Sequence, residues 1–221
     1  MSGCETLTNG TKVYTSEHYR IMQDSLLLAR FALRCLHSGF HGSLLDICAG
    51  SGAVGLTMLD EGFCGNASFV EIDKEACRLL RCSITENGLG ERCDVFEGDL
   101  LKFRTSAKFD VAVCNPPYFD CARGAVASDK YCAGARCETL CTLDDVLSCA
   151  ARSLKERGRL YICYRPERLS RLFCAAERCS FAPKALAFVR NAQQKEPWLA
   201  LVELRWRGGE GLHILPDIII K

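Results

Sequence analysis

The stretch SLLDICAGSG, residues 43–52, runs from an apolar segment directly into a glycine-rich turn. Residues 43–48 have the pattern of a buried strand, and the turn opens a short helical pattern over 53–61. With Gly55 the turn also satisfies the spacing G-x-G-x-x-G. Glycines in such a strand–turn–helix unit allow a tight turn and a close approach of backbone to a ligand. The stretch therefore predicts the first βα unit of an α/β fold, with a ligand-binding loop.

Strand and helix patterns alternate outward from this unit, which indicates parallel βαβ units and a sheet covered on both faces. The predicted strands cover residues 43–48, 67–72, 94–97, 109–114, 159–164, 184–190 and 198–205. The predicted helices cover 24–36, 53–61, 74–87 and 142–156, with a further one after Pro166. No helix separates the last two strands, so they should form a hairpin. We therefore predict an α/β, Rossmann-like fold of the class I methyltransferase type. It has a seven-stranded, mostly parallel sheet and a C-terminal antiparallel hairpin, whereas a doubly wound dehydrogenase would alternate to its end.

Length and charge set broad limits on this chain. Its 221 residues suffice for one domain. Within this single domain we expect residues 1–40 to form an N-terminal segment and helix covering the cofactor site, and residues 41–221 to form the class I methyltransferase fold. The net charge is +1, but residues 151–207 hold 13 Lys/Arg against 5 Asp/Glu. Such a segment could contact phosphates or simply be a solvated helix face. We see no signal peptide and no membrane span, so we expect a cytoplasmic protein.

Sixteen cysteines are present, and none of them forms a Cys-x-x-Cys pair. Several fall at apolar positions of the helix and strand patterns and are interpreted as small buried hydrophobes: Cys35, Cys48, Cys77, Cys114, Cys149 and Cys163. A denser group, Cys121, Cys132, Cys137 and Cys141, fits no common zinc spacing. We predict no metal site.

Acidic residues lie at the ends of three consecutive predicted strands. Asp46 precedes the glycines, where an acid suits a cationic amino group better than a pyrophosphate. Glu71 can accept hydrogen bonds from ribose hydroxyls, and Asp99 can meet an adenine amino group. These ligand features favour S-adenosylmethionine over a dinucleotide. The predicted cofactor-binding residues are Asp24, Asp46, Ala49, Gly50, Ser51, Gly52, Glu71, Ile72, Asp99, Leu100 and Asn115.

The tetrapeptide Asn115-Pro116-Pro117-Tyr118 follows the fourth predicted strand, at the sheet edge where open α/β folds bind ligands. Two prolines fix the backbone and remove donors, so the carbonyls of the turn and the Asn115 side chain remain as acceptors. Such a turn can accept both N–H bonds of a planar amino group, and Tyr118 can stack on the substrate ring. We assign these four residues as catalytic, the alternative being a rigid strand-end turn.

Together, Asp46–Gly52 and Asn115–Tyr118 resemble the N6-adenine and N5-glutamine methyltransferases. Further segments resemble the bacterial tRNA adenine-N6-methyltransferases that act on valine tRNA beside the anticodon. These segments are residues 24–29, 135–138, 164–169, 198–204 and 212–216. The resemblance implies S-adenosylmethionine as cofactor and N6 of an adenine, at position 37 of a tRNA, as the methyl acceptor. It covers about residues 19–220, with departures at Gln23, Cys137 and Arg190-Asn191.

On this interpretation a single-stranded anticodon loop is the partner, and the protein is a monomer or weak homodimer. The residues expected to contact RNA are Arg136, Arg165, Arg168, Arg171 and Arg190, with Arg178 in the same basic segment.

Four alternatives remain open at this point. A protein glutamine N5-methyltransferase presents the same planar N–H pair, although such enzymes usually carry an extra N-terminal helical domain. N-methylation of rRNA or DNA would use the same turn. A non-enzymatic RNA-binding module is disfavoured by the intact Asn115–Tyr118 turn. A nicotinamide oxidoreductase is disfavoured because the four histidines lie away from the predicted strand ends or in the tail.

Overall fold

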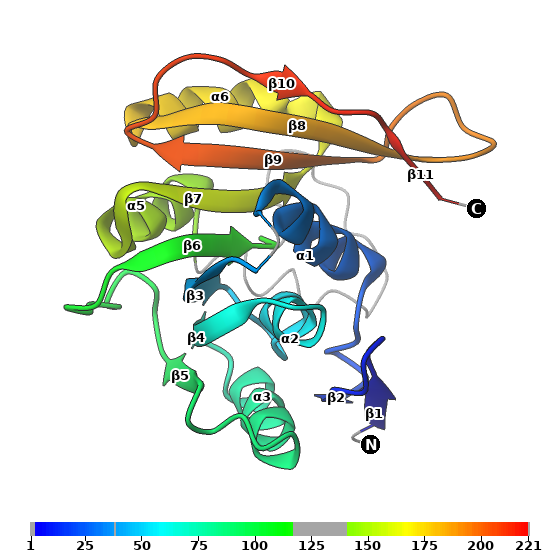
Figure 1. Cartoon of the computed structure of the whole chain (residues 1–221), viewed down its shortest axis with the longest axis vertical. Coiled ribbons are helices and arrows are strands. Elements are labelled where there is room, and N and C mark those ends of the chain that lie inside the picture. The colour runs from blue at the N-terminus through cyan, green and yellow to red at the C-terminus, as the bar shows by residue number, and fades with distance from the viewer. Residues whose placement is uncertain (1–2, 38, 117–140, 221) are drawn as a thin grey trace, which may run out of the picture.

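The computed structural model describes residues 3–37, 39–116 and 141–220. Its main sheet has nine strands, in the order β10-β8-β9-β7-β6-β3-β4-β5, with β11 also paired to β8 (Figure 1). Strands β3, β4, β5, β6 and β7 are parallel to one another, and β9 is antiparallel to both β7 and β8. The α/β class, the parallel centre and the C-terminal antiparallel hairpin are thereby confirmed.

The helices and strands follow the predicted alternation. In chain order the strands are β3 (His41–Ile47), β4 (Cys64–Glu71), β5 (Cys93–Glu97), β6 (Phe109–Cys114), β7 (Leu154–Tyr164), β8 (Phe181–Asn191) and β9 (Leu199–Trp206). The helices are α1 (Gln23–Cys35), α2 (Ala53–Asp60), α3 (Lys74–Glu86), α5 (Leu143–Ser153) and α6 (Leu169–Arg178), the last preceded by the 3-10 turn η1 (Pro166–Arg168).

Two hydrophobic layers cover the two faces of the sheet. Helices α1, α2 and α3 pack on one face and α5 and α6 on the other. Successive strand residues point to opposite layers: Leu44 belongs to the first and Leu45 to the second, and Tyr161 and Ile162 divide in the same way. This alternation, together with burial on both faces, explains why the central strands are apolar throughout.

Helix α5 shows both a confirmed prediction and a wrong boundary. Thr142 and Asp145 form the expected capping box, in which each side chain accepts the other's backbone N–H. The helix ends at Ser153, not at residue 156. Leu154 is 1% exposed and already pairs with Phe109 of β6, and Arg157 has a left-handed φ of 60°. Gly158 therefore lies within the irregular start of β7 and does not stop the helix.

The count of seven strands was too low, because two short strands lie outside the hairpin. β10 (His213–Ile214) and β11 (Ile218–Ile220) both pair in parallel with β8. They cover the edge of the sheet that β8 would otherwise expose. An exposed edge strand presents a row of unpaired backbone groups, which makes it prone to pair with other chains.

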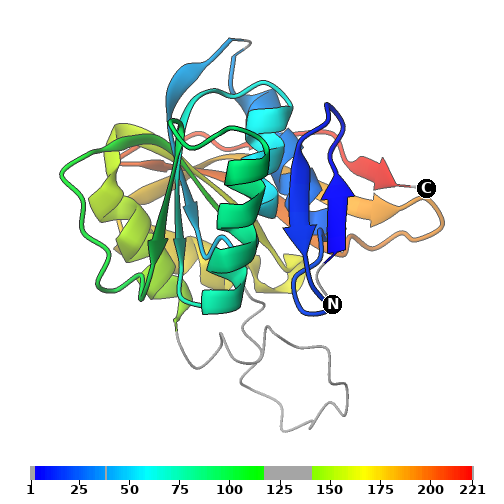
Figure 2. The ribbon, with the colours of Figure 1, turned by 90° about the horizontal axis from the view of Figure 1, so that it is seen from below.

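A second, two-stranded sheet precedes α1. β1 (Gly3–Thr6) and β2 (Lys12–Thr15) are antiparallel, and Figure 2 shows this hairpin beside α3. Asp60 at the end of α2 accepts the backbone N–H groups of Asn9 and Thr11, and Ser83 of α3 accepts that of Tyr14. The hairpin thus ties the C-terminal half of α2 to α3. Within the described residues, no helix is both long and apolar enough to cross a membrane.

Candidate active site

The glycine loop joins β3 to α2, and its three glycines have different roles. Gly50 has a φ of 56°, and a side chain there would meet only the Tyr19 ring, 3.8 Å away. Gly52 has a φ of 86°, and a Cβ there would clash with Leu80. A Cβ on Gly55 would clash with the Phe69 ring. Only Gly50 therefore faces open space in which a ligand could approach, while the other two glycines are required by packing.

Asp46 is buried behind this loop, at 1% exposure. Its Oδ2 accepts the backbone N–H of Gly55 at 2.9 Å, which links the end of β3 to the first turn of α2. The pKa of the Asp46 carboxyl is raised to about 7, mainly by burial; the Gly55 N–H opposes the shift, and the nearby Glu71 adds to it. Asp46 therefore shapes the loop; its predicted contact with a cationic amino group stays a prediction.

Glu71 at the end of β4 holds the other side of the loop. Its Oε2 accepts the N–H of Gly50 at 2.8 Å, and its Oε1 accepts those of Ile72 and Asp73 at 2.8 and 2.9 Å. Burial raises the pKa of this carboxyl, and the three backbone donors oppose the shift. A carboxylate has about four acceptor positions, so one remains for a further donor such as a ribose hydroxyl.

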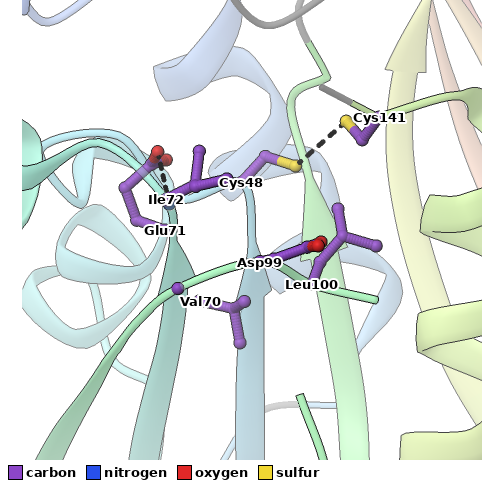
Figure 3. A pocket seen from close by; sticks show the side chains of 8 residues that line it. Cys48, Val70, Glu71, Ile72, Asp99, Leu100 and Cys141 are labelled. Atoms are coloured by element: carbon purple, nitrogen blue, oxygen red, sulfur yellow. Dashed lines mark hydrogen bonds between the residues drawn. The ribbon is translucent and has the colours of Figure 1, made fainter. Parts of the chain in front are cut away.

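A cavity opens at the carboxyl ends of β3, β4 and β5 (Figure 3). It has about 310 Å³ of empty space, part of it open to solvent. Of the predicted cofactor residues, Glu71, Ile72, Asp99 and Leu100 line it directly. The other seven do not: Asp24, Asp46, Ala49, Gly50, Ser51, Gly52 and Asn115. Asp99 uses Oδ1 to accept the N–H of Leu101, and Leu100 supplies an apolar wall that is 6% exposed. The three acidic strand ends therefore meet at one edge of the sheet.

Two cysteines in this cavity were missed as site residues. Cys48 and Cys141 both line it, and their sulfur atoms lie 4.0 Å apart (Figure 3). Cys48 has a φ of 58°, a conformation that favours glycine, so its interpretation as an ordinary buried hydrophobe was incomplete. A hydrogen bond with Cys114, followed by burial, raises the pKa of Cys48, and the contact with Cys48 raises that of Cys141. Both groups are therefore thiols at neutral pH.

Asn115 follows β6 and is held by residues from two other elements. Its Nδ2 donates to Ser25 Oγ on α1 at 2.9 Å, and its Oδ1 accepts from Cys163 Sγ on β7 at 2.8 Å. Ser25 is 6% exposed and donates its backbone N–H to Asp24 Oδ1. Burial raises the pKa of the Cys163 thiol, so it retains the proton that it donates. One lone pair of Oδ1 stays available beside a fixed amide.

Some predicted catalytic and RNA-contacting residues lie outside the described residues. These are Pro117, Tyr118, Arg136 and three of the grouped cysteines, Cys121, Cys132 and Cys137. Pro116 is described and is buried. Among the residues that the structure places, no group of three or more His, Cys, Asp or Glu side chains could hold a metal ion.

The described basic residues of the RNA prediction gather beyond β7 and β8. Arg165 donates to the carbonyl of Trp198, and Arg168 lies in η1. Arg171 is exposed on α6. Arg190 forms an ion pair with Asp217 at 3.0 Å, and Arg178 one with Asp144 at 2.6 Å. Arg165 directly follows β7 and Arg190 lies in the last two residues of β8, so both are on the same edge of the sheet as Asn115, because β6, β7 and β8 run in the same direction.

The cavity and the loop fit S-adenosylmethionine. Gly50 leaves backbone open in the loop, Glu71 keeps a free acceptor position, and Asp99 and the apolar Leu100 line the same cavity as Glu71. A seven-strand core with a reversed β9, ending in such a cavity, defines a class I S-adenosylmethionine-dependent methyltransferase.

Residues 25–172 match the methyltransferase small domain, and the chain belongs to that family. A tRNA1(Val) (adenine(37)-N6)-methyltransferase of Porphyromonas gingivalis strain W83 is 27% identical over 193 residues, which cover 85% of this chain and 74% of the relative. A ribosomal protein uL3 glutamine methyltransferase of Francisella tularensis is 33% identical over 78 residues, covering 35% of this chain and 25% of the relative.

Solved structures support the fold. A predicted O-methyltransferase from Agrobacterium tumefaciens superimposes with a TM-score of 0.66 at 17% identity, covering 88% of this chain and 86% of the other. The glycopeptide N-methyltransferase MtfA, solved with S-adenosylmethionine, gives a TM-score of 0.60 at 13% identity over 81% of this chain and 92% of the other. At these identities the likeness concerns the fold alone.

Proposed function

We propose that this methyltransferase transfers a methyl group to N6 of an adenine in RNA, with an anticodon-loop adenine at position 37 of a tRNA as the substrate. The observation that carries the proposal is the fixed amide of Asn115 at the end of β6. Asn115 directly follows β6, which pairs in parallel with β3, and Cys48 directly after β3 lines the cofactor cavity. Asn115 and the cavity therefore lie at the carboxyl ends of neighbouring strands.

An exocyclic amine on a purine ring is a weak nucleophile, because its lone pair is delocalised into the ring. S-adenosylmethionine, when bound, supplies an activated methyl group. The protein therefore has to orient the amine, and accepting its two N–H bonds favours a nitrogen whose lone pair points away from the ring plane. Asn115 Oδ1 supplies one such acceptor, and Pro116 adds rigid backbone without a donor. No strong general base is required by this chemistry.

The N-terminal segment contributes to the same site in our proposal. Tyr19 lies 3.8 Å from where a side chain on Gly50 would begin, and Ser25 holds Asn115. We infer that, of residues 1–40, the second half covers the cofactor, because the β1–β2 hairpin in the first half is hydrogen-bonded to α2 and α3.

The preference for tRNA rests on the extent of similarity and on charge. The match to the Porphyromonas relative runs over 193 residues, whereas the match to the glutamine methyltransferase stops after 78. Arg165, Arg168 and Arg171 follow the strand next to Asn115, where backbone phosphates around an extruded base would lie. An anticodon-loop base is single-stranded, so extrusion costs little.

A second candidate is a protein glutamine N5-methyltransferase. It is favoured by the higher local identity, 33%, to the Francisella enzyme over the residues that match. A glutamine amide offers the same planar N–H pair, so the Asn115 acceptor suits both substrates.

The test is transfer of labelled methyl from S-adenosylmethionine to total tRNA, rRNA, DNA and ribosomal protein from a host that lacks this gene. Label in N6-methyladenosine of tRNA supports the proposal, and label in N5-methylglutamine replaces it with the second candidate. The Asn115→Ala variant is the internal control: we expect no methyl transfer by it, while it still binds S-adenosylmethionine. Normal turnover by this variant would show that Asn115 is not the hydrogen-bond acceptor that orients the substrate amine.

A further inference from the structure

A second hollow lies on the α1 face of the sheet, at the end of α1 away from Asn115. It has about 950 Å³ of empty space, including open solvent, and is bounded by the end of α1, by β8 and β9, and by the segment that leads into β10. Its ionisable lining residues, apart from a cysteine, are Arg34, Lys184, Glu203, Arg205, Glu210 and His213. None of these residues belongs to the site described above.

The inner wall of the hollow carries more positive than negative charge. Glu203 is 5% exposed and pairs with Arg205 Nη2 at 2.9 Å, and Arg159 Nε lies 3.9 Å from the same carboxylate. Two guanidinium groups thus share one buried acid. The Nε of Arg205 is buried and has no hydrogen-bond partner in the described part of the chain. An unpaired buried donor is costly, and an added acceptor would satisfy it.

The rim adds further donors. Within the described residues, the exposed side chain of Arg34 has no ion pair or hydrogen bond, and the exposed His213 also lines the hollow. Lys184 Nζ donates to the carbonyls of Gly209 and Glu210, which holds the outer wall in place. In the described lining three cations, Arg34, Lys184 and Arg205, outnumber two acids, Glu203 and Glu210, so the hollow is positive even without His213.

One feature of the fold would oppose an anion here, since α1 ends at the hollow and helix C-termini are negative. The carbonyl of Cys35 at that end accepts a hydrogen bond from Arg159 Nη1 at 3.1 Å. This contact neutralises part of the helix end. Planar guanidinium groups with free N–H donors match the oxygens of a phosphate better than any neutral ligand.

Helix α1 connects the hollow to the active site. Ser25 near its start contacts Asn115, and Arg34 near its end lines the hollow. Nine residues of helix separate them, which is a distance of about 14 Å along the axis. A nucleotide chain that presents one base at Asn115 can cover this distance within a few residues.

We propose that this hollow binds a backbone phosphate of the RNA substrate, through Arg34 and Arg205 with His213 beside them. This inference rests on the proposed function. It also accounts for those basic residues of segment 151–207 that lie away from the active-site edge of the sheet. Lys184 and Arg205 line this hollow, and Arg159 pairs with its buried Glu203. Arg165, Arg168 and Arg171 lie beyond β7.

The test is the binding of a tRNA transcript, measured by fluorescence anisotropy over a series of salt concentrations. Arg34→Ala removes a cation with no described partner, so the fold should be unaffected. We expect its Kd to rise about five- to tenfold at moderate salt, and the slope of log Kd against log salt to fall by about 1. Arg78→Ala, an exposed arginine on α3 without a described partner, is the matched control and should bind as the wild type does.

Equal tRNA affinity and equal salt slope in the two variants would overturn the proposal. Inorganic phosphate is the second probe, with thermal stabilisation as readout. If phosphate stabilises the wild type but not Arg34→Ala, while tRNA binding is the same in both, the hollow takes a free phosphate compound and the RNA assignment is wrong. Because these readouts are binding and not methyl transfer, a failure of the proposed function appears separately, as a wild type that binds tRNA through Arg34 but does not methylate it.

Discussion

The hydrogen bond from Cys163 to Asn115 offers a way to separate orientation from packing at the active site. Cys163→Ala removes the Sγ that donates to Asn115 Oδ1, while the Ser25 contact keeps the other end of the amide in place. The amide then gains freedom to rotate about its single remaining tether. We expect slower methyl transfer with an unchanged Kd for S-adenosylmethionine.

The size of the effect follows from one hydrogen bond. A bond of this kind contributes a net stabilisation of about 1 kcal/mol. If all of it serves to orient the amide in the transition state, kcat falls roughly fivefold. Loss of one buried atom also leaves a small cavity, which lowers the free energy of unfolding by about 1 kcal/mol. The kinetic effect must therefore be distinguished from a loss of folded protein.

The assay measures kcat and KM for tRNA and for S-adenosylmethionine with labelled methyl, at a temperature where every variant is folded. Cys163→Ser keeps a donor at this position and should recover most of kcat. Cys149→Ala removes another fully buried sulfur, from α5 on the opposite face, and should lose stability but keep the wild-type kcat. Wild-type kcat in Cys163→Ala, or equal kcat in Cys163→Ala and Cys163→Ser, would refute the positioning role.

Three further predictions concern the cofactor loop. Because the pKa of Asp46 is raised to about 7, folding disfavours its ionised form, and the free energy of unfolding falls as pH rises towards 7. A cationic ligand beside Asp46 would favour the ionised form. The Kd for S-adenosylmethionine should therefore rise by up to tenfold for each pH unit below 7. Calorimetry should find this slope in the wild type and not in Asp46→Asn; the same slope in both would exclude the contact. Gly52→Ala should lower the free energy of unfolding by about 3 kcal/mol, from strain and the clash with Leu80. Gly62→Ala, with a φ of 116° and no neighbour within 4 Å, should lose less in urea unfolding, and equal losses would argue against the clash. Cys48→Gly should be about 1 kcal/mol more stable than Cys48→Ala, because the φ of 58° at this position strains any residue with a side chain. This order is the reverse of that inside helices. A Cys48→Ala variant at least as stable as Cys48→Gly would contradict the strain.

Much of this fold was readable from local patterns. The βα unit at residues 43–52, the capping box of Thr142 and Asp145, and the final hairpin depend on residues close in sequence, and all three are confirmed. Boundaries were less secure where tertiary contacts compete with local preference. Leu154 leaves the helix for β7 because its side chain is buried there, which no periodicity in residues 142–156 reveals.

The N-terminal hairpin was missed for a related reason. β1 and β2 have four residues each, which is too short for a strand pattern. The hairpin that they form is stabilised by hydrogen bonds to Asp60 and Ser83. These partners lie about 50 to 70 residues away in sequence. Isolated two-stranded hairpins are at best marginally stable, so such an element depends on what it packs against.

The candidate site divides along the same line. Local sequence patterns place Asp46, Glu71, Asp99 and Asn115 at strand ends, and hence at one edge of the sheet, because parallel strands bring their carboxyl ends together. What surrounds these residues depends on tertiary packing. Ser25 and Cys163 reach Asn115 across 90 and 48 residues, and Cys141 meets Cys48 across 93. Such contacts are set by how helices and strands pack after the chain has crossed the sheet, and local preferences carry no information about that packing.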